Sequence, residues 1–266
     1  MNDATPSQPP AAASTPLLHI VQGCATLTLN RPAHHNRLQV EDLLALRQHF
    51  EDLSAQPDLR VLVITGAGAS FCSGFDLGAL SGQLEAATAG PRLFEQTVDA
   101  LEALPMPTVC RLNGGVFGGA TDLALACDFR VGVAGMSLRM PAVRLGLHYY
   151  PSGMQRYVSR LGLATAKRLF LLAETLPADE LLRIGYLDQL CAPDRLDTAV
   201  QRLTDALCAA APLAARGMKA SLNEIARGEI DPSLLRERQQ QCAASADLRE
   251  GQRAFAEKRA PRFEGR

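Results

Sequence analysis

Four glycines in two pairs, Gly114-Gly115 and Gly118-Gly119, precede a run of small and apolar residues at 122–127. Glycine permits unusual backbone angles and lets another group approach the main chain closely. A glycine turn that opens a helix also leaves free N–H groups at the positive end of the helix dipole. Such groups stabilise negative charge that develops on an oxygen atom during a reaction. The same glycines also suit a tight strand-to-helix connection without chemistry, and the motif alone leaves both interpretations open.

The residues around these glycines are typical of buried secondary structure. Residues 108–112 form a short, largely apolar run after Pro107, which predicts a buried strand. Residues 122–127 predict a buried helix that begins near Gly119. Residues 60–65 contain a continuous apolar run, which indicates a strand covered on both faces.

The rest of the chain mixes strands and helices up to about residue 190 and is helical afterwards. Further strands are predicted at 17–30 (two, broken at Gly23), 129–134, 137–140 and 187–191, and helices from about Gln39 and at 92–104, 153–161, 164–174 and 178–184. We therefore predict an α/β fold in three parts: a disordered tail at residues 1–15, a core at 16–195 and a helical region at 196–266.

Composition argues against several classes of protein. The 266 residues are 47% hydrophobic, which supports one substantial core. The net charge of −1 lacks the positive footprint of a nucleic-acid-binding protein. Seven cysteines without a Cys-x-x-Cys pair argue against a disulfide scaffold or a metal site and favour a reducing, cytoplasmic location. No apolar run reaches the roughly 18–20 residues of a membrane span, and the N-terminus does not read as a signal peptide.

The chain resembles the crotonase superfamily, also called the enoyl-CoA hydratase/isomerase family, over residues 17–263. The segments that carry the resemblance occur in family order and spacing at 26–32, 36, 61–66, 71–77, 113–128, 144–146, 153–156 and 255–261. The resemblance implies a spiral of ββα turns and a helical C-terminal region that mediates oligomerisation, as a trimer or a dimer of trimers, and closes the CoA site. It also implies an acyl-CoA thioester as substrate, with no cofactor beyond the CoA itself.

The family places two backbone N–H groups around the thioester oxygen. By motif position, the resemblance assigns these groups to Ser73 and Gly119. An enolate oxygen requires fixed donors in a dry site, and loss of one such donor costs roughly 10²–10³ in rate. The assignment of Gly119 agrees with the catalytic interpretation of the glycine turn.

The family also binds the CoA nucleotide through backbone groups and basic side chains. The resemblance places the backbone contacts near Asn36 and Asp76 and makes Arg37 and Lys258 the candidate cations. Each of these two cations is equally compatible with an ordinary solvated surface position.

The chain departs from the family pattern at the two glutamates that hydratases use to position and deprotonate water. The first position holds Asp122, three residues after Gly119, and the second holds Ala142. Hydration requires groups that orient water and deliver a proton, and alanine does neither. Asp122 remains a candidate acid/base, because a carboxylate that enters an apolar helix tends to have a raised pKa. Its alternative role is a first-turn carboxylate that stabilises the helix dipole.

Residues 145–150 are similar to a loop of methylmalonyl-CoA decarboxylase, a relative in the same superfamily. That relative has a tyrosine at the position of Tyr149 and a histidine where this chain has Phe75. His148 and Tyr149 are therefore further catalytic candidates, although these side chains and Tyr150 equally suit structural anchors of the loop.

These residues favour proton transfer, isomerisation or decarboxylation through a thioester enolate over hydration. Two alternatives remain at this stage. One is a catalytically silent acyl-CoA-binding homologue, and the other is a genuine enoyl-CoA hydratase that uses Asp122.

Overall fold

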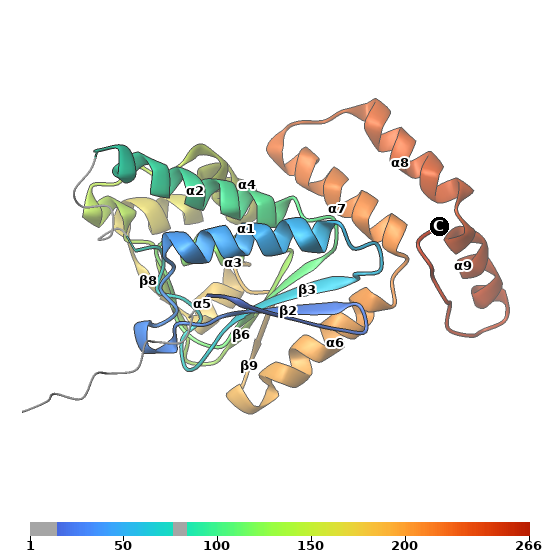
Figure 1. The fold of residues 1–266 in the computed structure, drawn as a ribbon, viewed down its shortest axis with the longest axis horizontal. Coiled ribbons are helices and arrows are strands. Elements are labelled where there is room, and N and C mark those ends of the chain that lie inside the picture. The colour runs from blue at the N-terminus through green and yellow to red at the C-terminus, as the bar shows by residue number, and fades with distance from the viewer. Residues whose placement is uncertain (1–14, 77–83) are drawn as a thin grey trace, which may run out of the picture.

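The computed structural model describes residues 15–76 and 84–266 (Figure 1). The predicted tail at 1–15 lies outside the described residues, apart from Thr15.

Six strands form the main sheet: β1 (Leu17–Val21), β2 (Cys24–Leu29), β3 (Val61–Gly66), β4 (Thr108–Leu112), β6 (Phe129–Val133) and β9 (Gln189–Cys191). They lie in the order β1-β2-β3-β4-β6-β9. Strands β1 and β2 pair as an antiparallel hairpin, and all other neighbours in the sheet are parallel. Strand β3 is buried along its whole length, as its apolar run predicts.

A second sheet contains three short strands: β5 (Val116–Phe117), β7 (Ser137–Arg139) and β8 (Thr175–Pro177). Strand β7 pairs in parallel with β5 and antiparallel with β8. The sequence analysis did not predict β8, because three residues are too few to show a periodic pattern and only pairing with β7 defines the strand.

The helices are α1 (Val40–Ser54), α2 (Leu84–Glu102), α3 (Ala120–Ala126), α4 (Pro151–Lys167), α5 (Ala178–Arg183), α6 (Leu196–Cys208), α7 (Pro212–Arg227), α8 (Pro232–Ala244) and α9 (Ala246–Ala256). Helices α1, α2 and α4 lie on one side of the main sheet and α6 on the other, while α8 and α9 extend away from it (Figure 1). The predicted α/β fold with a helical C-terminal region is confirmed.

One helix prediction needs correction, and one break between predicted helices is observed. Helix α2 begins at Leu84 instead of residue 92 and continues through Pro91, although proline inside a helix is unfavourable. Helix α4 is interrupted at Gly162, whose φ of 79° and ψ of 157° are not helical, in agreement with the break between the helices predicted at 153–161 and 164–174. Helix α2 packs against α1, α3 and α4, and this tertiary packing outweighs the local propensity.

A buried lysine attaches the helical region to the core. Lys219 on α7 donates to the carbonyl oxygen of Met106 at 2.9 Å and forms a 2.8 Å ion pair with Asp128. Asp128 also accepts from the backbone N–H of Thr108 at 2.7 Å, at the start of β4. The contact therefore links α7 directly to the strand that leads into the glycine turn.

The segment after α9 folds back along that helix. Glu250 accepts from Arg259 at 2.6 Å and from the backbone N–H of Arg262 at 3.0 Å. Asp247 accepts from the backbone N–H groups of Glu264 and Gly265 at 2.8 and 2.9 Å. Two carboxylates of α9 thus hold the last residues of the chain in place.

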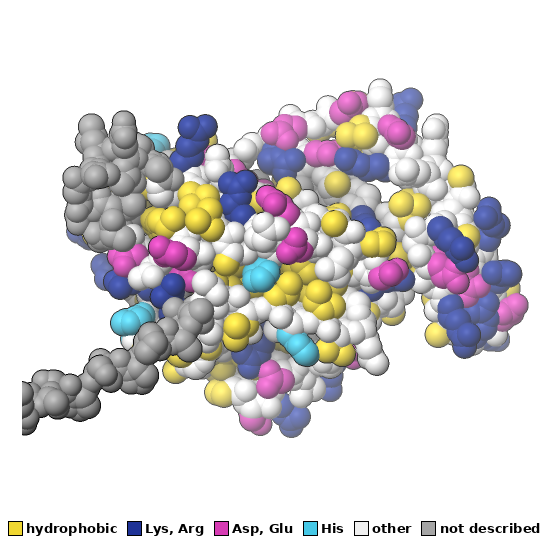
Figure 2. Space-filling model, in the orientation of Figure 1, with side chains coloured by type: hydrophobic (Ala, Val, Ile, Leu, Met, Phe, Trp, Pro, Cys, Tyr) yellow, Lys and Arg dark blue, Asp and Glu magenta, His cyan; other side chains and the backbone are white. Residues whose placement is uncertain are grey.

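Charges of both signs are interspersed on the face shown in Figure 2. All seven cysteines are free thiols. None of the helices within the described ranges combines the length and the apolar character that a membrane span requires.

Acid should release the C-terminal segment from α9. The hydrogen bonds from Arg259 and Arg262 lower the pKa of Glu250 to about 2, whereas an unfolded glutamate titrates near about 4.3. Because the folded pKa is depressed, the stabilisation is complete above roughly pH 4.3 and disappears as the pH falls toward the folded pKa. We expect the NMR signal of the Arg262 amide to shift across this range. Glu250→Gln should show the released position already at neutral pH, and a signal that does not move with pH would contradict the assignment.

Candidate active site

A pocket of about 230 Å³ lies between the end of β3, helix α2, the glycine turn and the loop before α4. Its lining is mainly apolar and aromatic: Ser73, Gly74, Phe75, Pro91, Phe94, Phe117, Gly118, Gly119, Met140, Pro141, Ala142, Leu145, Leu147, His148, Tyr149 and Tyr150. None of these lining residues is acidic. The titratable side chains among these described lining residues are therefore one imidazole and two phenols.

The sheet brings the two backbone segments of the pocket together. Strands β3 and β4 are adjacent and parallel, so the loops that follow them leave the same edge of the sheet. A bridge between Cys72 and Val116 then joins the loops, and the N–H of Phe117 donates to the carbonyl oxygen of Cys72 at 3.0 Å. The glycine turn is thus held against the loop at 72–76.

Gly74 allows the closest approach between these loops. Its φ of 101° lies in a region that side chains disfavour. A Cβ atom at this position would lie 2.9 Å from the carbonyl oxygen of Phe117 and 3.4 Å from the backbone nitrogen of Gly119. Because Gly74 has no side chain, this loop can lie close to the backbone nitrogen of Gly119.

The hydrogen bonds of the 72–76 loop determine which amide faces the pocket. Leu38 donates to the carbonyl oxygen of Gly74, and Asp76 donates to that of Leu38, both at 2.8 Å. In such a bridge the amide of the intervening residue, Phe75, points away from Leu38. Within the described part of the chain, neither Phe75 nor Gly119 has an acceptor for its N–H.

The assignment of Ser73 as an oxyanion donor needs correction. Its N–H donates to the carbonyl oxygen of His35 at 2.9 Å and is therefore already engaged. The geometry favours Phe75, two residues later, as the partner of Gly119. Spacing alone could not make this distinction, because the pairing of the loop with Leu38 decides the direction of each amide.

Asp122 is fully buried on α3, at 0% exposure, and does not line the pocket. Its Oδ2 atom accepts from the hydroxyl of Tyr150 at 2.5 Å and from Arg156 at 2.7 Å. Burial raises the pKa of Asp122, while the charge of Arg156 and the hydrogen bond from Tyr150 act in the opposite direction. The predicted acid/base residue thus lies behind the pocket wall, in contact with one tyrosine of that wall.

Arg156 on α4 is a site residue to which the sequence analysis gave no role. It donates to Asp122, to Asp99 at 2.8 Å and to Glu102 at 3.0 Å. Burial lowers the pKa of Arg156, but Asp122 and Glu102 together outweigh it and raise that pKa above its usual value. Its partners lie 34 to 57 residues earlier in the chain, so no local pattern could indicate the pairing.

The candidates of the loop before α4 occupy different positions. The rings of Tyr149 and Tyr150 are stacked with centroids 4.2 Å apart, and the hydroxyl of Tyr149 donates to that of Tyr150 at 3.2 Å. His148 is exposed at the pocket, with its Nδ1 atom 2.8 Å from the carbonyl oxygen of Tyr149. Only Tyr150 of these three contacts Asp122 directly.

The predicted CoA-binding residues lie outside the pocket lining. Asn36 is buried, its Oδ1 atom accepts from Arg31, and its Nδ2 atom donates to Ala67 and Ser70, so its side chain stabilises its own loop. Arg37 forms a 3.1 Å ion pair with Asp76.

Lys258 lies just after α9, which ends at Ala256, and does not line the pocket. The CoA-binding roles of Asn36, Arg37, Asp76 and Lys258 stay predictions. Among the described residues, no cluster of histidine, cysteine or acidic side chains could hold a metal ion.

Comparisons with known proteins agree with this architecture. The model of the family described as enoyl-CoA hydratase/isomerase matches residues 19–266. Crotonyl-CoA hydratase of Syntrophomonas wolfei is 32% identical, over 90% of this chain and 94% of the relative. The 1,2-epoxyphenylacetyl-CoA isomerase of Escherichia coli is 31% identical, over 94% of this chain and 98% of the relative.

A solved enoyl-CoA hydratase/carnithine racemase of Magnetospirillum magneticum is similar in structure, with a TM-score of 0.90 at 25% identity over 96% of this chain and 97% of the other. The chain therefore belongs to the enoyl-CoA hydratase/isomerase family and has the crotonase fold. It is a family enzyme that acts on acyl-CoA. Its relatives include hydratases and an isomerase, so the family alone does not specify the reaction.

Gly74→Ala should destabilise the protein and impair the pocket. The new Cβ atom meets the carbonyl oxygen of Phe117 and the backbone angle becomes strained, so we expect a loss of more than about 1 kcal/mol in the free energy of unfolding. Urea denaturation measures this loss. Gly251→Ala is the matched control, because its Cβ atom would make only an ordinary 3.6 Å contact with Phe263. Equal effects of the two substitutions would contradict the close approach at Gly74.

Proposed function

We propose that this enzyme converts an acyl-CoA through a thioester enolate, by proton transfer, isomerisation or decarboxylation, and not by hydration. The observation that carries the proposal is a pair of backbone N–H groups, at Phe75 and Gly119, beside a pocket; among the described residues, neither N–H has an acceptor and no lining residue is acidic. Two such donors stabilise an enolate oxygen, and a dry pocket strengthens them.

The composition of the wall is unfavourable for hydration. Ala142 lines the pocket and offers no proton acceptor. Asp122 is separated from the pocket by Tyr150, so it does not meet a water bound there. Addition of water needs groups that orient the water and transfer its protons, and the lining residues that the structure describes offer no carboxylate for this purpose.

The remaining parts of the proposal follow the family. The CoA nucleotide binds near the loops of Asn36 and Asp76, with Arg37 and Lys258 as candidate cations for its phosphates. The proposed reaction needs no cofactor beyond the CoA of the substrate.

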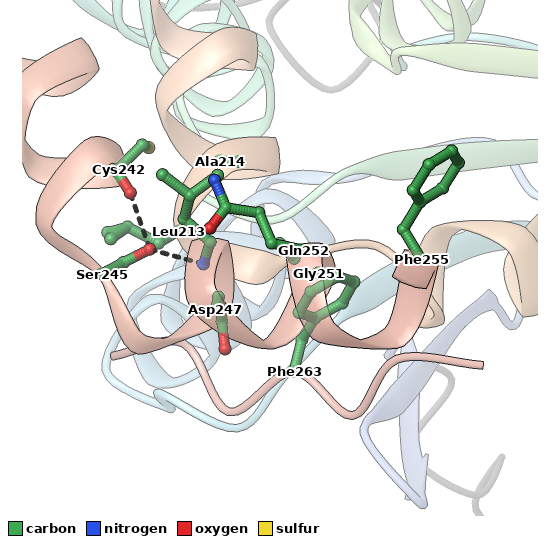
Figure 3. A pocket seen from close by; sticks show the side chains of 11 residues that line it. Leu213, Ala214, Cys242, Ser245, Asp247, Gly251, Gln252, Phe255 and Phe263 are labelled. Carbon is green, nitrogen blue, oxygen red and sulfur yellow. Dashed lines mark hydrogen bonds between the residues drawn. The ribbon is translucent and has the colours of Figure 1, made fainter. Parts of the chain in front are cut away.

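We also propose that the helical region mediates a homo-oligomer. Exposed apolar side chains follow α7 and α9, among them Met218 at 60%, Leu222 at 65% and Phe255 at 88%. An apolar pocket of about 390 Å³ lies between α7, α8 and α9, and Phe255 is one of the residues that line it (Figure 3). Such a surface suits burial against a second copy of the chain.

A panel of CoA esters tests the reaction type. We expect the enzyme to exchange α-protons, isomerise or decarboxylate at least one of a set of enoyl-, malonyl-, methylmalonyl- and 3-hydroxyacyl-CoA esters in D₂O. Mass spectrometry detects each change. Crotonyl-CoA should remain unhydrated, because none of the described residues of the pocket wall is acidic.

Two results would contradict this expectation. Robust hydration of crotonyl-CoA that Asp122→Ala abolishes would identify a hydratase that uses Asp122. Tight binding of CoA esters without any turnover would identify a catalytically silent binding protein.

Phe255→Glu should weaken the proposed oligomer, because it places a charge in an apolar interface. Sedimentation velocity should show a smaller species for this variant than for the wild type. Leu44→Glu on α1 is the control, since Leu44 is also exposed, at 55%, but lies outside the helical region. A wild-type protein that is monomeric at every concentration would refute the oligomer.

A further inference from the structure

Asp122 communicates with the pocket through a single side chain. Its carboxylate is fully buried, and Tyr150 is the one pocket-lining residue to which the structure gives it a hydrogen bond, among the described residues. The 2.5 Å distance between the Tyr150 hydroxyl and Oδ2 of Asp122 is short for a hydrogen bond. Among the described residues, this phenol is therefore the hydrogen-bonded link between Asp122 and the pocket.

The other carboxylate oxygen of Asp122 accepts no hydrogen bond from the described residues. Oδ1 of Asp122 is buried and has no hydrogen-bond partner, whereas Oδ2 accepts from both Tyr150 and Arg156. A buried anionic oxygen without a donor is costly. This cost favours uptake of a proton by the carboxylate, while the charge of Arg156 favours its ionised form.

We propose that Tyr150 is the catalytic residue that exchanges a proton with the substrate, and that Asp122 acts behind it as the acceptor of the relayed proton. This inference rests on the proposed function, because it requires an acyl-CoA whose α-carbon reaches Tyr150. Arg156 is a positioning residue that holds Asp122 in place.

The proton transfer balances as follows. The C–H bond at the substrate α-carbon breaks, and its proton forms a new O–H bond with the Tyr150 oxygen. The original O–H bond of Tyr150 breaks at the same time, and that proton bonds to Oδ2 of Asp122. The electron pair of the C–H bond becomes the enolate, whose oxygen accepts from the N–H groups of Phe75 and Gly119. The reverse relay returns a proton to the same or to a neighbouring carbon, which gives exchange or isomerisation.

The neighbours of Tyr150 support this role over the alternatives. The hydroxyl of Tyr149 donates to the Tyr150 oxygen at 3.2 Å, so it stabilises negative charge that develops there. Tyr149 has no direct contact with Asp122 among the hydrogen bonds of the described residues. His148 is exposed and contacts the backbone of Tyr149 instead. Tyr149 is therefore a positioning residue for Tyr150.

The groups around Asp122 determine how the relay depends on pH. Glu102 lies on α2, Arg156 and Tyr157 lie on α4, and Tyr149 and Tyr150 lie in the loop before α4. Tyr186 lies in the segment after α5. Burial of Asp122 outweighs Arg156 and Tyr150 and raises its pKa above the usual value near about 3.9. Below that raised pKa the acceptor is already protonated, so exchange should fall as the pH drops through it.

The test compares α-proton exchange by three variants with the wild type, on whichever ester of the panel the wild type uses. Tyr150→Phe keeps the ring and its contact with Phe94 but removes the relay, so we expect kcat to fall by about 10²–10⁴ with little change in KM. Tyr149→Phe, the matched control on the adjacent ring, should lose less than about tenfold, as expected for one neutral hydrogen bond. Asp122→Asn should lose activity like Tyr150→Phe and should also lose the acid limb of the pH profile.

The possible outcomes separate the two hypotheses. A wild type inactive on every ester overturns the proposed function and this inference with it. A wild type that exchanges protons while Tyr150→Phe retains full kcat overturns only the role of Tyr150. Circular dichroism checks the folding of each variant. If Tyr150→Phe is unfolded, the acid limb of the pH profile of Asp122→Asn tests the relay instead. An unchanged acid limb in that variant would exclude Asp122 as the acceptor.

Discussion

The carboxylate of Asp122 has no access to solvent, and its burial constrains much of the surrounding structure. A buried carboxylate must be neutralised or hydrogen-bonded, and loss of one partner of a buried ion pair costs about 3–5 kcal/mol. Arg156 supplies the charge and Tyr150 the hydroxyl, so α4 and the loop before it must pack against α3. Gly153 permits this packing, since a Cβ atom there would lie 2.8 Å from Oδ2 of Asp122.

The backbone of the pocket depends on a second set of contacts. The loop at 72–76 pairs with Leu38 on one side and with Val116 on the other, which fixes the direction of each amide. Gly119 must also lack a side chain, because a Cβ atom would lie 2.7 Å from the ring of Phe94. The same ring lines the pocket. The two amides and the apolar wall are thus positioned by one set of contacts.

The pocket differs from the hydratase pattern of the family in the groups that would act on water. Hydratases use two glutamates for this purpose, whereas the titratable side chains among the described residues of the wall are phenols and an imidazole. Phe75 and Phe94 pack with centroids 5.8 Å apart, and Phe94 packs in turn on Tyr150 at 6.1 Å. Apolar rings on these sides exclude water, which strengthens the donors and disfavours addition of water to an intermediate.

Local sequence patterns were sufficient for the strands at 61–66 and 108–112, for α3 and for the position of the glycine turn, because periodicity and glycine act over a few residues. Motif spacing also identified Asp122 and the missing second glutamate at Ala142. The tertiary structure decided the rest. Whether Ser73 or Phe75 presents its amide depends on pairing with Leu38, and the partnership of Asp122 with Tyr150 and Arg156 joins residues about 30 positions apart. The glycine turn was evident in the sequence, because its residues are adjacent. The contacts of Asp122 leave no local pattern, because they depend on packing between helices.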